Sequence, residues 1–184
     1  MHQDLERWLS DAREAGLDDE SVEALILDGR PFFAGACADG GVYLVDAESG
    51  EAVGGPLLGL TSQVLAVAVA TLADGTVMVA AGGEGRRILR WDAATGRPIG
   101  EPLTGPKHWV MRLAFRALPD GRILLISADD SGVVHRWDAV SGRQPRRRGG
   151  RRTRSAALVN RAWPGRYRWG RRRRRNGSGS RGGS

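Results

Sequence analysis

The segment ILRWDAATGRPIGEPLTG (residues 88–105) contains a core sequence that returns as VHRWDAVSG at residues 134–142. Sliding the sequence against itself extends this similarity into a repeat with a period of 46 residues. The positions that recur at this spacing are Asp46, Asp92 and Asp138, then Gly50, Gly96 and Gly142, the Asp-Gly pairs that begin at Asp28, Asp74 and Asp120, Val64 with Val110, and Pro56 with Pro102. The alignment needs no insertion between residues 28 and 142, so three units share one geometry.

The second unit shows short apolar segments separated by turn signals, which is a β pattern. Its segments are LAVAVATL (65–72), TVMVAAG (76–82), RILRWD (87–92) and RPIGEPL (97–103). The Asp-Gly and Thr-Gly pairs between them supply the positive φ that tight hairpins need. Alternating large and small apolar residues are typical of strands that are covered on both faces. We therefore expect an all-β protein with four antiparallel strands in each complete unit, and a first strand that starts at Val22.

The pairs Trp91-Asp92 and Trp137-Asp138 close the third expected strand of successive units. In this feature, in its period and in its strand number, the chain resembles the WD-repeat β-propeller family over residues 21–142. The resemblance implies a partial propeller of three four-stranded antiparallel blades, the last one incomplete. The implied repeats span about 21–59, 60–105 and 106–142.

The other signatures of the family are eroded in this chain. The Gly-His that opens a unit is replaced by Gly105-Pro106 in one copy and by Gly59-Leu60 in another. The family's Asp, six residues before the Trp, is Gly85 in the second unit and Ser131 in the third. Only the first unit keeps this aspartate, as Asp39 before Val45. The resemblance therefore implies that the buried Asp-His-Ser-Trp network of the family is complete in no blade.

The residues at the repeat positions are expected to be structural. An indole at one fixed position in each unit should pack between neighbouring blades, which places Trp91 and Trp137 in the core. Asp92 and Asp138 should accept hydrogen bonds from the turn that follows each of them, and Asp46 occupies the same repeat position.

Motifs that could carry chemistry are few. The glycine-rich GGEGRRI (82–88) joins two expected strands instead of opening a helix, which disfavours a phosphate loop. Asp129-Asp130 could be an acid pair for metal binding or general acid work, but a solvated turn is favoured. His108 has no conspicuous acid-base partner in the sequence, and the single cysteine, Cys37, has no metal-binding spacing. The sequence therefore predicts no enzymatic activity, no metal site and no cofactor.

The resemblance to WD-repeat propellers implies a non-enzymatic scaffold that binds a protein or peptide through the loops on one face. These loops nominate Trp109 as the anchor, with Lys107 beside it and Arg86, Asp129 and Asp130 in the others. Packing of Trp109 against the adjoining blade is the alternative interpretation. Three blades cannot close a ring of four to eight, so open apolar faces predict self-association.

The two ends of the chain differ from the repeats. Residues 4–16 place apolar residues at helical spacing, which predicts a short amphipathic helix within residues 1–20. Residues 143–184 hold 16 of the 28 Lys and Arg residues and no Asp or Glu, so the rest of the chain is acidic, with 12 basic against 21 acidic residues. We expect a disordered, low-complexity basic tail there. No membrane span or signal peptide is evident, so the expected compartment is the cytoplasm, without a membrane partner.

The tail begins where the repeat predicts the fourth strand of the third blade. The segment RPIGEPLTG should recur at 143–151, but the chain reads RQPRRRGGR. One hypothesis is a shifted reading frame in a GC-rich, bacterial gene, which would make the chain a truncated piece of a larger propeller without independent activity. The alternative is a nucleic-acid-binding tail that contacts phosphates through arginine and stacks Trp163, Tyr167 and Trp169 on bases.

Overall fold

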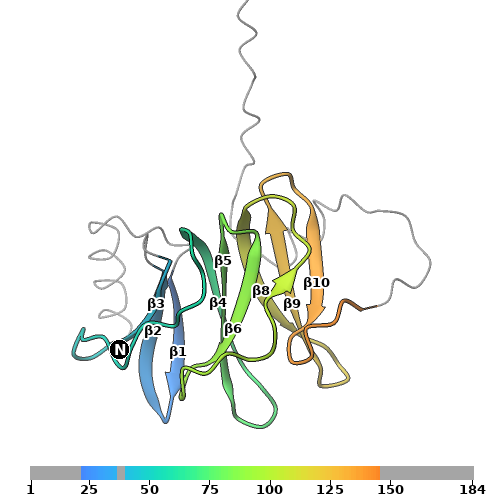
Figure 1. Ribbon diagram of the computed structural model, residues 1–184. Coiled ribbons are helices and arrows are strands. Elements are labelled where there is room, and N and C mark those ends of the chain that lie inside the picture. The colour runs from blue at the N-terminus through green and yellow to red at the C-terminus, as the bar shows by residue number, and fades with distance from the viewer. Residues whose placement is uncertain (1–21, 37–39, 146–184) are drawn as a thin grey trace, which may run out of the picture.

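The computed structural model describes residues 22–36 and 40–145, which form three antiparallel β-sheets (Figure 1). The first sheet has the order β1-β2-β3, the second β4-β5-β6-β7 and the third β10-β9-β8. The strands are β1 (Val22–Leu27), β2 (Arg30–Ala36), β3 (Val42–Asp46), β4 (Val64–Thr71), β5 (Val77–Gly83), β6 (Arg87–Asp92), β7 (Leu103–Thr104), β8 (Val110–Ala117), β9 (Ile123–Asp129) and β10 (Val134–Asp138). The all-β prediction is confirmed, and the described residues from Val22 onward form a strand as expected.

The sheets lie side by side, and their first strands contact one another, β1 with β4 and β4 with β8 (Figure 1). The expected N-terminal helix, Cys37, Asp39 and the tail beyond residue 145 lie outside the described residues. Within residues 22–36 and 40–145, no helix has the length and apolar character to cross a membrane.

The expected fourth strand is confirmed in the second sheet and its expected absence from the third sheet holds for the described residues, but the first sheet lacks the fourth strand that was predicted for it. In the second sheet it is reduced to the two residues of β7 and an isolated bridge between Trp91 and Pro98. In the first unit only two isolated bridges remain, Val42 with Leu57 and Val45 with Ala52. Gly54 and Gly100 hold the same repeat position with φ of +74° and +66°, a conformation that interrupts an extended strand. Among the described residues the third sheet has no fourth strand.

The turn after the third strand of each sheet is built in the same way three times. The backbone N–H groups of Asp46, Asp92 and Asp138 donate to the carbonyl oxygens of Glu51, Arg97 and Arg143 at 2.8 to 2.9 Å. Their carboxylates accept backbone N–H groups of the turn at 2.9 Å, from Ser49, Ala94 and Ser141 respectively. The 46-residue period of the sequence is therefore also a period of the hydrogen bonds.

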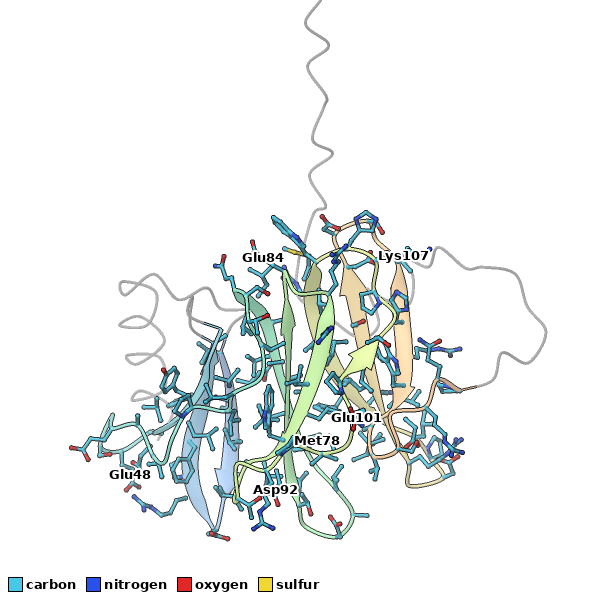
Figure 2. All side chains as sticks on the ribbon, in the orientation of Figure 1. Glu48, Met78, Glu84, Asp92, Glu101 and Lys107 are labelled. Carbon is cyan, nitrogen blue, oxygen red and sulfur yellow. The ribbon has the colours of Figure 1, made fainter. Side chains whose placement is uncertain are left out.

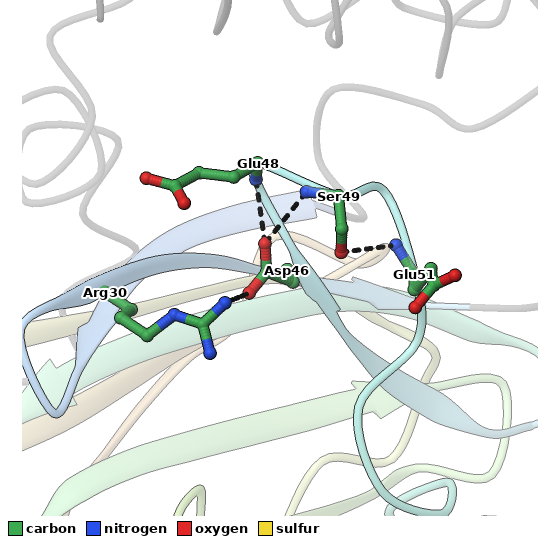
Figure 3. A network of polar contacts seen from close by, with 5 residues as sticks. All are labelled: Arg30, Asp46, Glu48, Ser49 and Glu51. Atoms are coloured by element: carbon green, nitrogen blue, oxygen red, sulfur yellow. Dashed lines mark hydrogen bonds and ion pairs between the residues drawn. The ribbon is translucent and has the colours of Figure 1, made fainter.

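Figure 3 shows this turn in the first sheet. Asp46 is buried and accepts the N–H groups of Ser49 and Glu48, and the guanidinium of Arg30 also donates to it. The hydrogen bonds from the Ser49 and Glu48 backbone hold the pKa of Asp46 below its ordinary value, because they stabilise the charged carboxylate.

Two apolar clusters fill the spaces between the sheets. Trp91 belongs to the cluster between the first and second sheets, and Trp137 to the cluster between the second and third. Each indole is 1% exposed, and Trp91 Nε1 donates to the carbonyl oxygen of Leu58 at 3.2 Å. The tryptophans thus pack one sheet against the next, and burying such large side chains supplies much of the apolar stabilisation.

Arg90 is a buried cation that the sequence analysis did not single out. It occupies the repeat position of Leu44, is 2% exposed, and joins the second sheet to the third. Its Nη1 donates to the carbonyl oxygens of Ala139 and Val140 at 2.7 and 3.1 Å, and its Nη2 to that of Glu101 at 3.1 Å. Burial lowers the pKa of Arg90 from its ordinary value, because desolvation disfavours the charged form. Three carbonyl dipoles replace the lost water, and the two from Ala139 and Val140 connect the second sheet to the third.

Candidate partner-binding loops

The nominated loops lie at one end of the sheets. Figure 2 shows Glu84 and Lys107 at this end, with Met78 and Asp92 towards the opposite end. The turn between β5 and β6 is tied to the loop before β4 by the Glu84 N–H, which donates to the Gln63 carbonyl oxygen at 3.2 Å. One period later, the Asp130 N–H donates to the Trp109 carbonyl oxygen at 3.1 Å. Equivalent hydrogen bonds therefore connect the two loops within the second sheet and the two loops within the third sheet.

Trp109 is the exposed aromatic residue of this end. Its side chain is 48% exposed, and Lys107, two residues earlier, is exposed as well. His108 Nδ1 lies 3.4 Å from Asp130 Oδ1, so the β9–β10 turn holds the loop before β8 through a side-chain contact as well as the backbone bond. Trp109 and Asp130 therefore lie on two loops that are bonded to each other, and His108 adds a second contact between these loops.

Asp129 has a different role from its neighbour Asp130. It is 1% exposed, and its Oδ1 accepts the Ser131 N–H at 3.1 Å, the Ser131 hydroxyl at 2.6 Å and the Val133 N–H at 3.0 Å. It is therefore a buried residue that shapes the turn, instead of the solvated turn residue expected from the sequence. Its side chain is closed off from a partner, while Asp130 remains exposed.

Arg86 sits at the tip of the β5–β6 turn. It is exposed, has a φ of +58° and donates its backbone N–H to the Gly83 carbonyl oxygen at 3.2 Å. A left-handed conformation is unfavourable for a residue with a Cβ, and here it turns the chain back into β6. No hydrogen bond described for Arg86 connects it with Trp109, so it belongs to a separate loop at the same end.

A polar group behind the β9–β10 turn was missed by the sequence analysis. His135 Nε2 lies 3.9 Å from Asp129 Oδ2, and the His135 ring stacks on Trp137 with centroids 5.5 Å apart. Burial lowers the pKa of His135, and the Asp129 carboxylate opposes that shift. Ser127 is fully buried on the adjacent strand, and its hydroxyl has no hydrogen-bond partner among the described residues. The family pattern has its aspartate six residues before the Trp, whereas Asp129 lies eight residues before Trp137, so the sequence pattern did not point to this group.

A pocket of about 310 Å³ opens between the second and third sheets, away from the Trp109 loop. Its lining residues are Arg90, Glu101, Pro102, Leu103, Thr104, Trp137, Ser141, Gly142 and Gln144. Arg90 contributes a buried Nε that has no hydrogen-bond partner among the described residues. No group of three or more His, Cys, Asp or Glu side chains in residues 22–36 and 40–145 is arranged to hold a metal ion.

Comparison of the chain with protein-family models and with curated protein sequences finds no match.

Proposed function

We propose that this chain is a partial WD-repeat propeller and acts as a non-enzymatic scaffold that binds a protein or peptide through Trp109. Three sheets placed side by side, with turn hydrogen bonds that recur every 46 residues, support the propeller assignment. Buried tryptophans between the sheets support it as well, because propeller blades pack through such residues.

The observation that carries the scaffold proposal is an exposed indole on a fixed loop. Trp109 is half-exposed, while its own carbonyl group is held by the Asp130 N–H. An aromatic side chain on a preorganised backbone binds a partner at low entropic cost, and such residues dominate interface energies. Lys107 adds a positive charge beside the indole, so an apolar side chain next to an acidic residue would complement this surface.

A peptide library displayed on phage and selected against the full chain tests this proposal. We expect one enriched peptide family whose affinity falls by ~30-fold with Trp109→Ala, the effect of removing a contact hot spot. Leu58→Ala is the matched control, because Leu58 is another exposed apolar residue, outside the Trp109 loop, and its affinity should change by less than ~2-fold. Selection of no family, or of families that bind Trp109→Ala as well as the original chain, would contradict the proposal.

A second candidate function is nucleic-acid binding through residues 143–184, which hold 16 Arg and no acidic residue. Replacing Arg171 to Arg175 with glutamine should reduce the salt dependence of single-stranded RNA binding. A loss of several phosphate contacts lowers the slope of log K against log salt by ~0.7 for each contact. A slope that is the same before and after replacement would remove this candidate.

The proposal that the chain is a truncated piece of a larger propeller has a genetic test. The DNA from codon 135 onward is translated in all three frames. A shifted frame that restores the repeat should place an apolar residue at position 145 and a leucine at position 149, by analogy with Ile99 and Leu103. If neither shifted frame restores the repeat, the truncation hypothesis is refuted.

A further inference from the structure

We infer that the outer edge of β10 is a binding site for an extended peptide segment of a partner protein, which completes the third sheet as its fourth strand. This site is separate from Trp109, and the inference holds or fails independently of the function proposed for that residue.

The first argument is the position of β10 in its sheet. β10 is an edge strand in the order β10-β9-β8, whereas the corresponding β6 lies between β5 and β7. In the first two units, the segment after the turn comes back along the third strand. The Val53 N–H donates to the Leu44 carbonyl oxygen at 2.8 Å, and the Ile99 N–H donates to the Arg90 carbonyl oxygen at 2.7 Å.

The second argument is the residue that occupies the corresponding position in the third unit. One period after Ile99 the chain has Pro145, and one period after Arg90 it has Arg136. Proline has no backbone N–H, so the bond that starts the returning strand cannot form to the Arg136 carbonyl group. The chain itself therefore cannot repeat at β10 the contact that it makes twice elsewhere.

The third argument is that the turn before Pro145 is intact. The Asp138 N–H donates to the Arg143 carbonyl oxygen at 2.8 Å, and the Gly142 N–H donates to the Asp138 carbonyl oxygen at 2.9 Å. β10 also pairs with β9 along all five of its residues. The edge is consequently a preformed strand, so a partner can bind it without the entropy cost of ordering this part of the protein.

The fourth argument is burial. In β6, Ile88 is fully buried and Arg90 is 2% exposed. At the same positions in β10, Val134 is only partly buried and Arg136 is exposed. β6 is covered by β7 at its edge and by the third sheet on its face, whereas among the described residues β10 has neither neighbour, so both its edge and its face are open. An uncovered edge strand is a template for pairing with another chain.

The chain itself shows the chemistry of the segment that fits. EAVGGPLLG (51–59) and RPIGEPLTG (97–105) each have an apolar residue at their third position whose backbone N–H donates to the third strand, and a leucine four residues later. These leucines, Leu57 and Leu103, are 3% and 5% exposed. The partner is thus an extended segment with an apolar residue and a leucine at this spacing, which binds by β-strand addition.

The first experiment uses two labelled peptides and the full chain. RPIGEPLTG should bind with a rise in fluorescence anisotropy and should slow hydrogen exchange of the backbone amides in residues 133–138. RPPGEPLTG, in which proline replaces the residue corresponding to Ile99, should bind at least ~10-fold more weakly, because it lacks the donor to Arg136. Equal binding of both peptides, no binding of either, or slowed exchange only around β6 would overturn the inference.

The second experiment changes the protein at the edge. The Asp138 N–H donates to the Arg143 carbonyl oxygen of the following turn, on the side of β10 away from β9. The N–H groups of alternate residues in a strand point to the same side, so the Arg136 N–H faces the open edge as well. Arg136→Pro should therefore lose at least ~10-fold in affinity for RPIGEPLTG, while Arg136→Ala, which keeps the N–H, should bind like the original chain. Trp109→Ala should also bind unchanged, so a failure at one site is distinguishable from a failure at the other. Affinities of Arg136→Pro and Arg136→Ala that are equal, for folded variants judged by tryptophan fluorescence, would contradict the edge model.

Discussion

Gly50, Gly96 and Gly142 provide a controlled test of the packing between the second and third sheets. They occupy one repeat position, and their φ angles are +73°, +66° and +69°, so alanine is strained equally at all three. That strain amounts to about 1–2 kcal/mol for a residue with a Cβ in the left-handed region. The three sites differ only in what an added methyl group would meet.

A methyl group at Gly50 would have no neighbour within 4 Å, and at Gly96 it would lie 3.7 Å from Leu57 Cδ2, an ordinary contact. At Gly142 it would lie 2.8 Å from Leu103 Cδ2 and 3.0 Å from Arg90 Nη2. Neither atom can move freely, because Leu103 is buried and the Arg90 guanidinium is held by three carbonyl oxygens. Such overpacking costs about 1–3 kcal/mol beyond the backbone strain.

We therefore expect Gly142→Ala to lower the free energy of unfolding by about 2–5 kcal/mol, and Gly50→Ala by about 1–2 kcal/mol. Urea unfolding followed by tryptophan fluorescence measures both. The double variant Arg90→Ala with Gly142→Ala should be less unstable than the sum of its single changes, because the clash is partly removed. Equal losses at Gly50 and Gly142 would refute the packing described for Arg90.

Three further predictions concern the core, the pH dependence of stability and the assembly. Trp91→Phe should lower the free energy of unfolding by about 1 kcal/mol more than the loss of ring volume alone, because the hydrogen bond to the Leu58 carbonyl group is lost. Trp137→Phe, which removes the same ring volume, is the matched control for that volume effect. The folded-state pKa of His135 lies below its unfolded value, so its contribution to stability is present above pH ~6.5 and is lost as the pH falls through the folded-state pKa. Urea unfolding at several pH values should therefore show a free energy of unfolding that falls less in acid for His135→Phe than for the original chain. An unchanged fall would contradict the lowered pKa of His135. Sedimentation equilibrium should give an average mass above 19.8 kDa that rises with concentration, and a constant monomer mass would exclude self-association.

The sequence predicted the central strands well because their pattern is periodic. The Trp-Asp pairs and the Asp-Gly turns place β4, β5 and β6 within one or two residues of the expected segments. Asp28 and Gly29 have φ of +51° and +76°, as a tight two-residue hairpin requires. The repeat spacing transferred this assignment from one unit to the next.

The remaining features depend on contacts between units, which periodicity does not encode. Arg90 looked like an ordinary strand residue, since two of the three carbonyl groups that hold it come from the neighbouring sheet. Asp129 looked solvated because its three hydrogen-bond donors come from a turn whose shape the sequence leaves open. Pro145, in contrast, was visible in the sequence, but its meaning depends on the N–H that Ile99 donates to Arg90.

Backbone hydrogen exchange of β10, compared with that of β6 in the full chain, tests whether the third sheet is unfinished. The two strands correspond in the repeat, but β6 is an inner strand and β10 is the open edge of its sheet. After correction for intrinsic rates, residues 133–138 should exchange faster than residues 87–92. Equal protection of the two segments would show that β10 is already covered, and would contradict both the unfinished third sheet and the binding edge inferred from it.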